Sequence, residues 1–228
     1  MTGVQTCALP ISYPNGIGPT GLVPVNLIGG RVYNAAVRQI PIASGYAQNI
    51  GYGDFVTYTT DGTIVRVDTT AGAKTTFASA PVGIFLGCSY VSATGMKYFT
   101  PNQYWPTGTT VLQDNENYGY GWAYVCEDPD AVFIATLTDG SGNLYTASGA
   151  TQANVGENVG YYVGTGLVNT TTGNSIVSVN LASAATTNTL PLRIVDLDRS
   201  TALSDGTYQR VLVSFNAGFH FYRQTTGI

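Results

Sequence analysis

The chain has 228 residues, of which 10% are charged and 44% hydrophobic, whereas a typical soluble domain is about 25% charged. Helix surfaces are usually built from Lys, Glu, Gln and Arg, so this composition excludes a protein made of long amphipathic helices. The net charge of −4 argues against nucleic acid as a partner. Apolar runs such as residues 82–86 are far shorter than the roughly 20 residues that a membrane helix needs. We therefore expect a Gly-, Thr- and Tyr-rich β protein with neither nucleic acid nor a membrane as its partner.

The first residues, MTGVQTCALPIS, share no pattern with the rest of the chain. They resemble the translation of a sequencing adapter that stands at the start of many genes assembled from environmental DNA. Residues 1–11 are therefore interpreted as an artefact and set apart from the fold. A signal peptide is the competing interpretation, but the segment has no charged start and Pro10 interrupts its apolar stretch.

Residues 12–45 are predicted to form an extended arm. Within it, residues 15–30 (NGIGPTGLVPVNLIGG) are rich in Gly and Pro and lack a regular period, which indicates a segment that lies along another surface. A GxGxxG spacing begins at Gly16, but Pro19 interrupts it and no strand precedes it, so dinucleotide binding is discounted. The aliphatic residues of the arm that we expect to bind a partner are Leu22, Val23, Val25, Leu27 and Ile28.

Short strand candidates follow the arm and alternate with turn signals. The Asp-Gly pair at residues 61–62 separates two alternating runs, 54–60 and 63–68, and predicts a β-hairpin. Residues 82–91 (VGIFLGCSYV) are almost continuously apolar, which is typical of a strand buried on both faces.

The second group of candidates begins near residue 108 and continues to the tail 218–223 (GFHFYR). Its strands are expected at residues 123–127, 131–138, 158–163, 175–180, 190–196 and 209–215. About ten to twelve short strands without a convincing helix predict an all-β domain over residues 46–228, a β-barrel or β-sandwich, with a jelly roll among the candidates. We expect two lobes, 46–92 and 108–228, and a joining loop long enough to be functional.

Two cysteines, Cys88 and Cys126, lie in apolar strand text. The chain has no CxxC pair and no Cys/His spacing suited to zinc. Buried free thiols are favoured over a Cys88–Cys126 disulfide, which the sequence alone leaves open.

The residues that could carry chemistry have simpler structural interpretations. His220, the only histidine, alternates with Phe219 and Phe221, and no GxSxG elbow accompanies it, so packing is favoured over a catalytic triad. Asp128 and Asp130 flank Pro129 and favour a turn over a calcium loop, which needs more oxygen ligands. We therefore predict no catalytic residue, no metal site and no cofactor, and we do not expect an enzyme.

Two aromatic groups are denser than a core requires. Tyr104 and Trp105 lie in the long loop, and we add them to the expected partner-binding residues. Alternation in YGYGWAY, residues 118–124, puts Tyr and Trp on one strand face and Gly and Ala on the other. That face either binds a sugar or protein partner or lines a barrel core, and the sequence leaves both open.

Several segments together resemble the small structural proteins encoded beside the major capsid protein in tailed bacteriophages. The segments are GLVPVNLIGG, PIASGY, GDFVTYTTDGTIVRV, PVGIFLGCSYV, FTPNQYW, LPLRIVDL and VLVSFNAGFHFY. The resemblance to head decoration proteins implies a virion structural protein that binds the outside of the capsid and cements neighbouring capsomers. It also implies the major capsid protein as partner, a homo-oligomer, and a place on the capsid surface after assembly in the host cytoplasm.

The alternative function is a carbohydrate-binding or host-recognition module of a phage fibre or a secreted adhesin. The aromatic strand face at residues 118–124 supports this alternative.

Overall fold

The computed structural model describes residues 19–92, 97–100, 104–112, 120–143, 145, 149–201 and 209–227. These residues form two β-sheets and contain no α-helix, with two 3-10 turns, η1 (Gln152–Asn154) and η3 (Phe221–Arg223). The all-β prediction is therefore confirmed. No helix in this described part is long and apolar enough to cross a membrane.

The larger sheet closes into a barrel. Its eight strands are β1 (Val23–Leu27), β2 (Arg31–Val32), β6 (Gly72–Lys74), β10 (Ala131–Thr138), β11 (Asn158–Asn169), β12 (Asn174–Ala185), β13 (Leu192–Leu197) and β14 (Arg210–Phe215). Their order is β12-β11-β13-β14-β10-β1-β2, and β6 pairs with β11. Because β10 also pairs in parallel with β12, strands β10, β14, β13, β11 and β12 form a closed ring.

The described part of the predicted arm belongs to both sheets, which corrects the expectation of a separate extended segment: residues 22–32 join the barrel, and residues 38–43 form a strand of the smaller sheet. Strand β1 pairs with residues 131–134 of β10, whereas β12 pairs with residues 137 and 138 of the same strand. Since β14 covers the other edge of β10, β1 fills the part of the edge that β12 leaves open. Leu22, directly before β1, is fully buried in the barrel core. The arm is held by an edge that its own chain provides more than 100 residues later.

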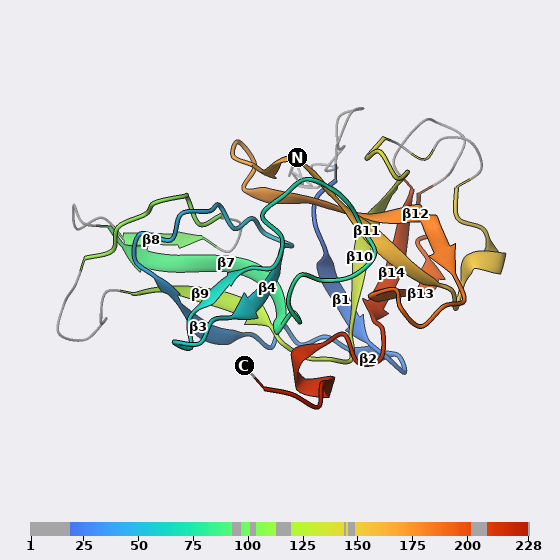
Figure 1. The fold of residues 1–228 in the computed structure, drawn as a ribbon, viewed down its shortest axis with the longest axis horizontal. Helices are drawn as coiled ribbons and strands as arrows, with labels where there is room; N and C mark the ends of the chain where they lie inside the picture. Colours follow the sequence, from blue (N-terminus) through green and yellow to red (C-terminus); the bar gives the residue numbers. More distant parts are fainter. Residues whose placement is uncertain are drawn as a thin grey trace, which may run out of the picture.

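The smaller sheet lies beside the barrel along the long axis of the molecule (Figure 1). Its strands are β3 (Arg38–Ala43), β4 (Phe55–Tyr58), β5 (Ile64–Arg66), β7 (Gly83–Val91), β8 (Lys97–Thr100) and β9 (Tyr120–Cys126), in the order β3-β9-β7-β4-β5 with β8 on β7. The expected hairpin is present as β4 and β5, and Gly62 in its turn has a φ of 80°.

The smaller sheet encloses its own core. Trp105, from the loop before β9, is fully buried there and stacks over Gly121. A Cβ added to Gly121 would lie 2.2 Å from the Trp105 ring, so glycine is needed at this position. Cys88 and Cys126 are both buried and free, which confirms the expectation of two thiols.

The lobes are not the continuous stretches 46–92 and 108–228. Strand β9 pairs with β3 and β7 in the smaller sheet, while β1, β2 and β6 belong to the larger one. The chain therefore enters the larger sheet for the third time between β9 and β10, at the turn that holds Asp128 and Asp130.

Candidate functional site

Three backbone segments meet between the two lobes. The N–H of Leu22 donates to the carbonyl of Gly53 at 3.1 Å, the N–H of Tyr52 donates to Gly173 at 2.9 Å, and the N–H of Ser175 donates to Tyr52 at 2.9 Å. Gly21 and Gly53 lie so close that a Cβ on either would come within 2.8 Å of the other's Cα. The segments therefore approach one another through bare backbone.

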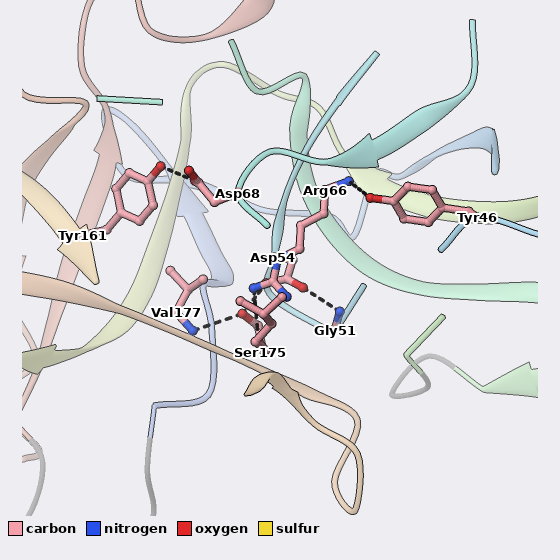
Figure 2. Close-up of polar contacts among 9 residues, drawn as sticks. Tyr46, Gly51, Asp54, Arg66, Asp68, Tyr161, Ser175 and Val177 are labelled. Carbon is pink, nitrogen blue, oxygen red and sulfur yellow. Dashed lines mark hydrogen bonds and ion pairs between the residues drawn. The ribbon is translucent and has the colours of Figure 1, made fainter. Parts of the chain in front are cut away.

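Asp54 stands at the centre of this junction (Figure 2). Its carboxylate is completely buried and accepts a hydrogen bond from the N–H of Gly51 at 2.6 Å and another from the Ser175 hydroxyl. The buried Arg66 guanidinium forms an ion pair with it at 2.7 Å and also donates to the Leu167 carbonyl at 3.1 Å. Asp54 and Arg66 come from the smaller lobe, whereas Ser175 and Leu167 come from β12 and β11 of the barrel.

A second buried carboxylate, Asp68, links the same two lobes. It lies just after β5 and accepts a hydrogen bond from the hydroxyl of Tyr161 on β11 (Figure 2). Burial raises the pKa of Asp68, and burial next to this carboxylate raises that of Tyr161.

Burial also raises the pKa of Asp54, from its ordinary 3.8 to about 6. The positive charge of Arg66 and the hydrogen bonds from Ser175 and Gly51 lower this pKa, but the loss of hydration outweighs them. This junction was not predicted from the sequence. The available signal was an Arg and two Asp in otherwise apolar strand text, GDFVTY and TIVRVD.

His220 lies in a different part of the junction, inside an aromatic cluster. Its ring packs edge-on to Phe215 at 5.0 Å between centroids, and its Nδ1 accepts the N–H of Tyr222 at 3.3 Å. Burial, together with the nearby positive charge of Arg223, lowers its pKa from 6.5 to about 4. These contacts make His220 a neutral cap of the 3-10 turn η3.

The acidic cluster at residues 127–130 shapes a turn and binds arginines. The Asp128 carboxylate accepts the N–H of Asp130 at 2.8 Å, while Glu127 and Asp130 pair with Arg38 and Arg223. Among the residues that the structure describes, no three His, Cys, Asp or Glu side chains lie close enough together to hold a metal ion.

Most of the exposed apolar side chains lie in two segments, the β1–β2 hairpin with its flanking residues and the C-terminal turn. Within the described ranges, seven large hydrophobic residues are exposed, and five of them lie on or beside the β1–β2 hairpin and the C-terminal turn. We call these five the hairpin face: Val25, Ile28, Val32, Val37 and Tyr222. Three arginines connect its parts, because Arg31 and Arg223 both pair with Asp130, and Arg38 donates to the Tyr222 hydroxyl.

The expected partner-binding residues divide into three groups. Val25 and Ile28 are exposed on the hairpin face, and Val23, Leu27 and Tyr104 are half-buried. Leu22 and Trp105 are fully buried in the protein's own two cores, so these two residues are corrected to core positions. Val32 and Val37, within the predicted arm, and Tyr222 in the tail are also exposed, but they were not predicted as partner-binding residues.

The aromatic face of β9 lies outside the core of the smaller lobe. Gly121, Ala123 and Val125 point inward and are buried, whereas Trp122 and Tyr124 alternate with them and are half-buried. The Tyr124 hydroxyl donates to Ser89 on the neighbouring strand at 3.2 Å. Of the two interpretations that the sequence left open, a barrel core lined by these two aromatics is wrong. Tyr118 lies outside the described residues.

Comparison with known proteins adds no relative: no family model, no curated protein and no solved structure matches this chain.

Proposed function

We propose that this protein is a capsid decoration protein of a tailed bacteriophage, which binds the outside of the capsid and cements neighbouring capsomers. The hairpin face is the observation that carries the proposal. Exposed aliphatic and Tyr side chains interleaved with arginines are the composition of protein-binding surfaces. A cementing role requires no catalytic group and no cofactor, and it places the protein on the virion surface with the major capsid protein as its partner.

The open edge of the larger sheet supports docking at the same place. Among the described strands, β2 pairs with β1 alone, so its outer edge can accept a strand from a second copy or from the capsid protein. Each contact need contribute only modestly, because a capsid lattice presents many copies at once.

Occupancy on purified capsids tests the proposal. Replacing Ile28, Val32 and Val37 with Asp is expected to reduce occupancy at least tenfold, because charged side chains then meet an apolar contact. Val195→Asp is the control, since Val195 is also an exposed valine but lies on β13 in the barrel. Occupancy that is unchanged in the triple variant, or equally reduced in the control, contradicts docking through the hairpin face.

A second candidate function, saccharide binding, is favoured by the outward position of Trp122 and Tyr124. The two aromatic side chains lie two residues apart on one face of β9, and the Tyr124 hydroxyl and Ser89 add polar groups beside them. Binding to a panel of immobilised glycans tests it with Trp122→Ala, and Tyr222→Ala serves as an aromatic control on the hairpin face. Glycan binding that Trp122→Ala abolishes and Tyr222→Ala leaves intact would support this function instead.

A further inference from the structure

The arginines beside the hairpin face lie further out than the carboxylates that they pair with. The side chains of Arg31, Arg38 and Arg223 are 44–67% exposed. Their partners Asp130 and Glu127 are 28–35% exposed. Arg31 and Arg223 also share the single carboxylate of Asp130. A molecule that approaches this face therefore meets guanidinium groups first, although the protein as a whole has a net charge of −4.

The outer edge of β2 presents backbone groups next to these arginines. The N–H of Ile28 donates to the carbonyl of Asp130 at 2.8 Å, so the alternation of an antiparallel ladder turns Leu27 towards Arg31 on β2. The following residue, Val32, then directs its N–H and carbonyl away from β1. Because β2 pairs with β1 alone among the described strands, these groups of Val32 face an open edge.

The two residues of β2 differ in the chemistry that they offer. Arg31 and Val32 are neighbours on one strand, so their side chains point to opposite faces, and Val32 is 74% exposed. A strand that pairs with this edge places its own side chains alternately beside Arg31 and beside Val32. A carboxylate suits the first position, because it binds a guanidinium through two parallel hydrogen bonds, and an aliphatic side chain suits the second.

We propose that the hairpin face binds an extended segment of a protein partner in which acidic residues alternate with aliphatic residues. The segment adds a strand to the edge of β2, its carboxylates pair with Arg31 and Arg223, and its aliphatic side chains cover Val32. This inference rests on the proposed function, because it takes the hairpin face as the docking surface and adds the chemistry of the segment that docks there.

The same observations disfavour two other occupants. In a symmetric contact of this face with a second copy, the outward arginines of the two copies would lie opposite each other and repel. A nucleic acid would meet the half-buried carboxylates of Glu127, Asp128 and Asp130 beneath the arginines, on a protein with a net charge of −4. A short acidic segment needs only local pairs with exposed guanidinium groups.

NMR titration of the whole protein tests the chemistry of the segment. The probe is a synthetic peptide of about ten residues that alternates Val and Glu, and Val/Gln and Val/Lys peptides of equal length are compared with it. At millimolar concentration the Val/Glu peptide is expected to shift the amide resonances of Arg31 and Val32 and to leave that of Val213 in the barrel unchanged. The other two peptides are expected to bind at least about fivefold more weakly. Equal binding of either one, or no shift at Arg31 and Val32 with any peptide, overturns the proposal.

Arginine variants test the same contact from the side of this protein. Arg31→Gln combined with Arg223→Gln removes both guanidinium groups that share Asp130 and is expected to weaken binding of the Val/Glu peptide about tenfold. Arg199→Gln is the matched control, because Arg199 is an exposed arginine outside the face and donates to Gln152. Arg31→Lys combined with Arg223→Lys keeps the charge without the planar fork and is expected to bind with intermediate strength. Unchanged binding in the double Gln variant contradicts the proposal.

The other occupants have readouts of their own. Sedimentation velocity measures self-association, and a dimer that the double Gln variant abolishes would make a second copy the occupant. A duplex DNA oligonucleotide that binds more tightly than the Val/Glu peptide would make nucleic acid the occupant. Either result overturns the acidic segment.

Occupancy on purified capsids separates this inference from the proposed function. If both are correct, the double Gln variant and the variant with Asp at positions 28, 32 and 37 each reduce occupancy at least tenfold. If only the Asp variant reduces occupancy, the face docks through apolar contact alone, which overturns the acidic segment and leaves the proposed function in place. If neither variant reduces occupancy, docking through the hairpin face is wrong, and the proposed function fails with it.

Discussion

Two buried ionisable side chains oppose each other in their effect on stability. The folded state raises the pKa of Asp54 to about 6, so folding takes up a proton at this site between pH 4 and 6. Binding of this proton stabilises the folded state, and that stabilisation is lost as the pH rises. The folded state lowers the pKa of His220 to about 4, so the unfolded chain binds the proton between pH 4 and 6.5, and stability is lost as the pH falls. In the same pH window the two effects largely cancel.

Single substitutions are expected to separate these effects. Relative to the wild type, Asp54→Asn becomes more stable as the pH rises from 5 to 7, and His220→Gln becomes more stable as the pH falls over the same range. The difference in unfolding free energy between each variant and the wild type changes by up to about 1.4 kcal/mol per pH unit. Urea unfolding at pH 5, 6 and 7 measures them, and parallel slopes for both variants would contradict the assignment.

Gly121 offers a test of packing at a single position. Gly121→Ala places a methyl group inside the Trp105 ring, and the resulting overpacking is expected to cost about 1–3 kcal/mol of unfolding free energy. Trp105→Phe in the same background removes part of the clash and is expected to restore some stability. Gly62→Ala probes backbone strain alone, because nothing lies within 4 Å of a Cβ at that position.

The strands that local sequence predicts are those whose partners are close in the chain. The β4–β5 hairpin was predictable because its Asp-Gly turn and both alternating runs lie within residues 54–68. The place of β1 was not, because the edge that it completes belongs to β10, far along the chain. The Asp54 junction has the same origin, since Ser175 is 121 residues from its partner. Composition and alternation therefore predicted the fold class, and they gave an outward aromatic face of β9 as one of two options. Which strands belong to which lobe depends on pairing between distant segments, which local sequence does not show.

Strand β1 provides a test of the corrected arm. Leu22→Ala is expected to destabilise the protein by about 2–5 kcal/mol, because it leaves a cavity in the barrel core. Val25→Asp, three residues away on the bulged part of β1, is exposed and is expected to change stability by less than about 0.5 kcal/mol. Thermal or urea unfolding distinguishes the two, and equal effects would contradict the position of β1 in the barrel.

The core of the barrel also includes side chains from the smaller lobe. Phe55 lies on β4 of the smaller sheet, and Phe77 lies in the connection between β6 and β7. Both rings contact Tyr161 and Phe215 of the barrel, with ring centroids 5.0–6.2 Å apart. The chain passes between the lobes several times, and the C-terminal turn crosses beneath their contact (Figure 1). Folding of either lobe therefore depends on the other.

We expect the whole molecule to unfold in a single cooperative transition. Calorimetry should give a van't Hoff enthalpy equal to the calorimetric enthalpy, because the shared aromatic cluster couples the lobes.

Phe77→Ala removes the ring that contacts Phe55, Tyr161 and Phe215 together and is expected to cost about 3–5 kcal/mol of unfolding free energy. It is also the substitution best placed to split the transition in two, since each lobe keeps its own strand pairing. Tyr90→Ala, a large aromatic confined to the core of the smaller lobe, is the control and is expected to lower stability without splitting the transition. Two resolved transitions in the wild-type protein would show that the lobes fold independently and that the cluster does not couple them.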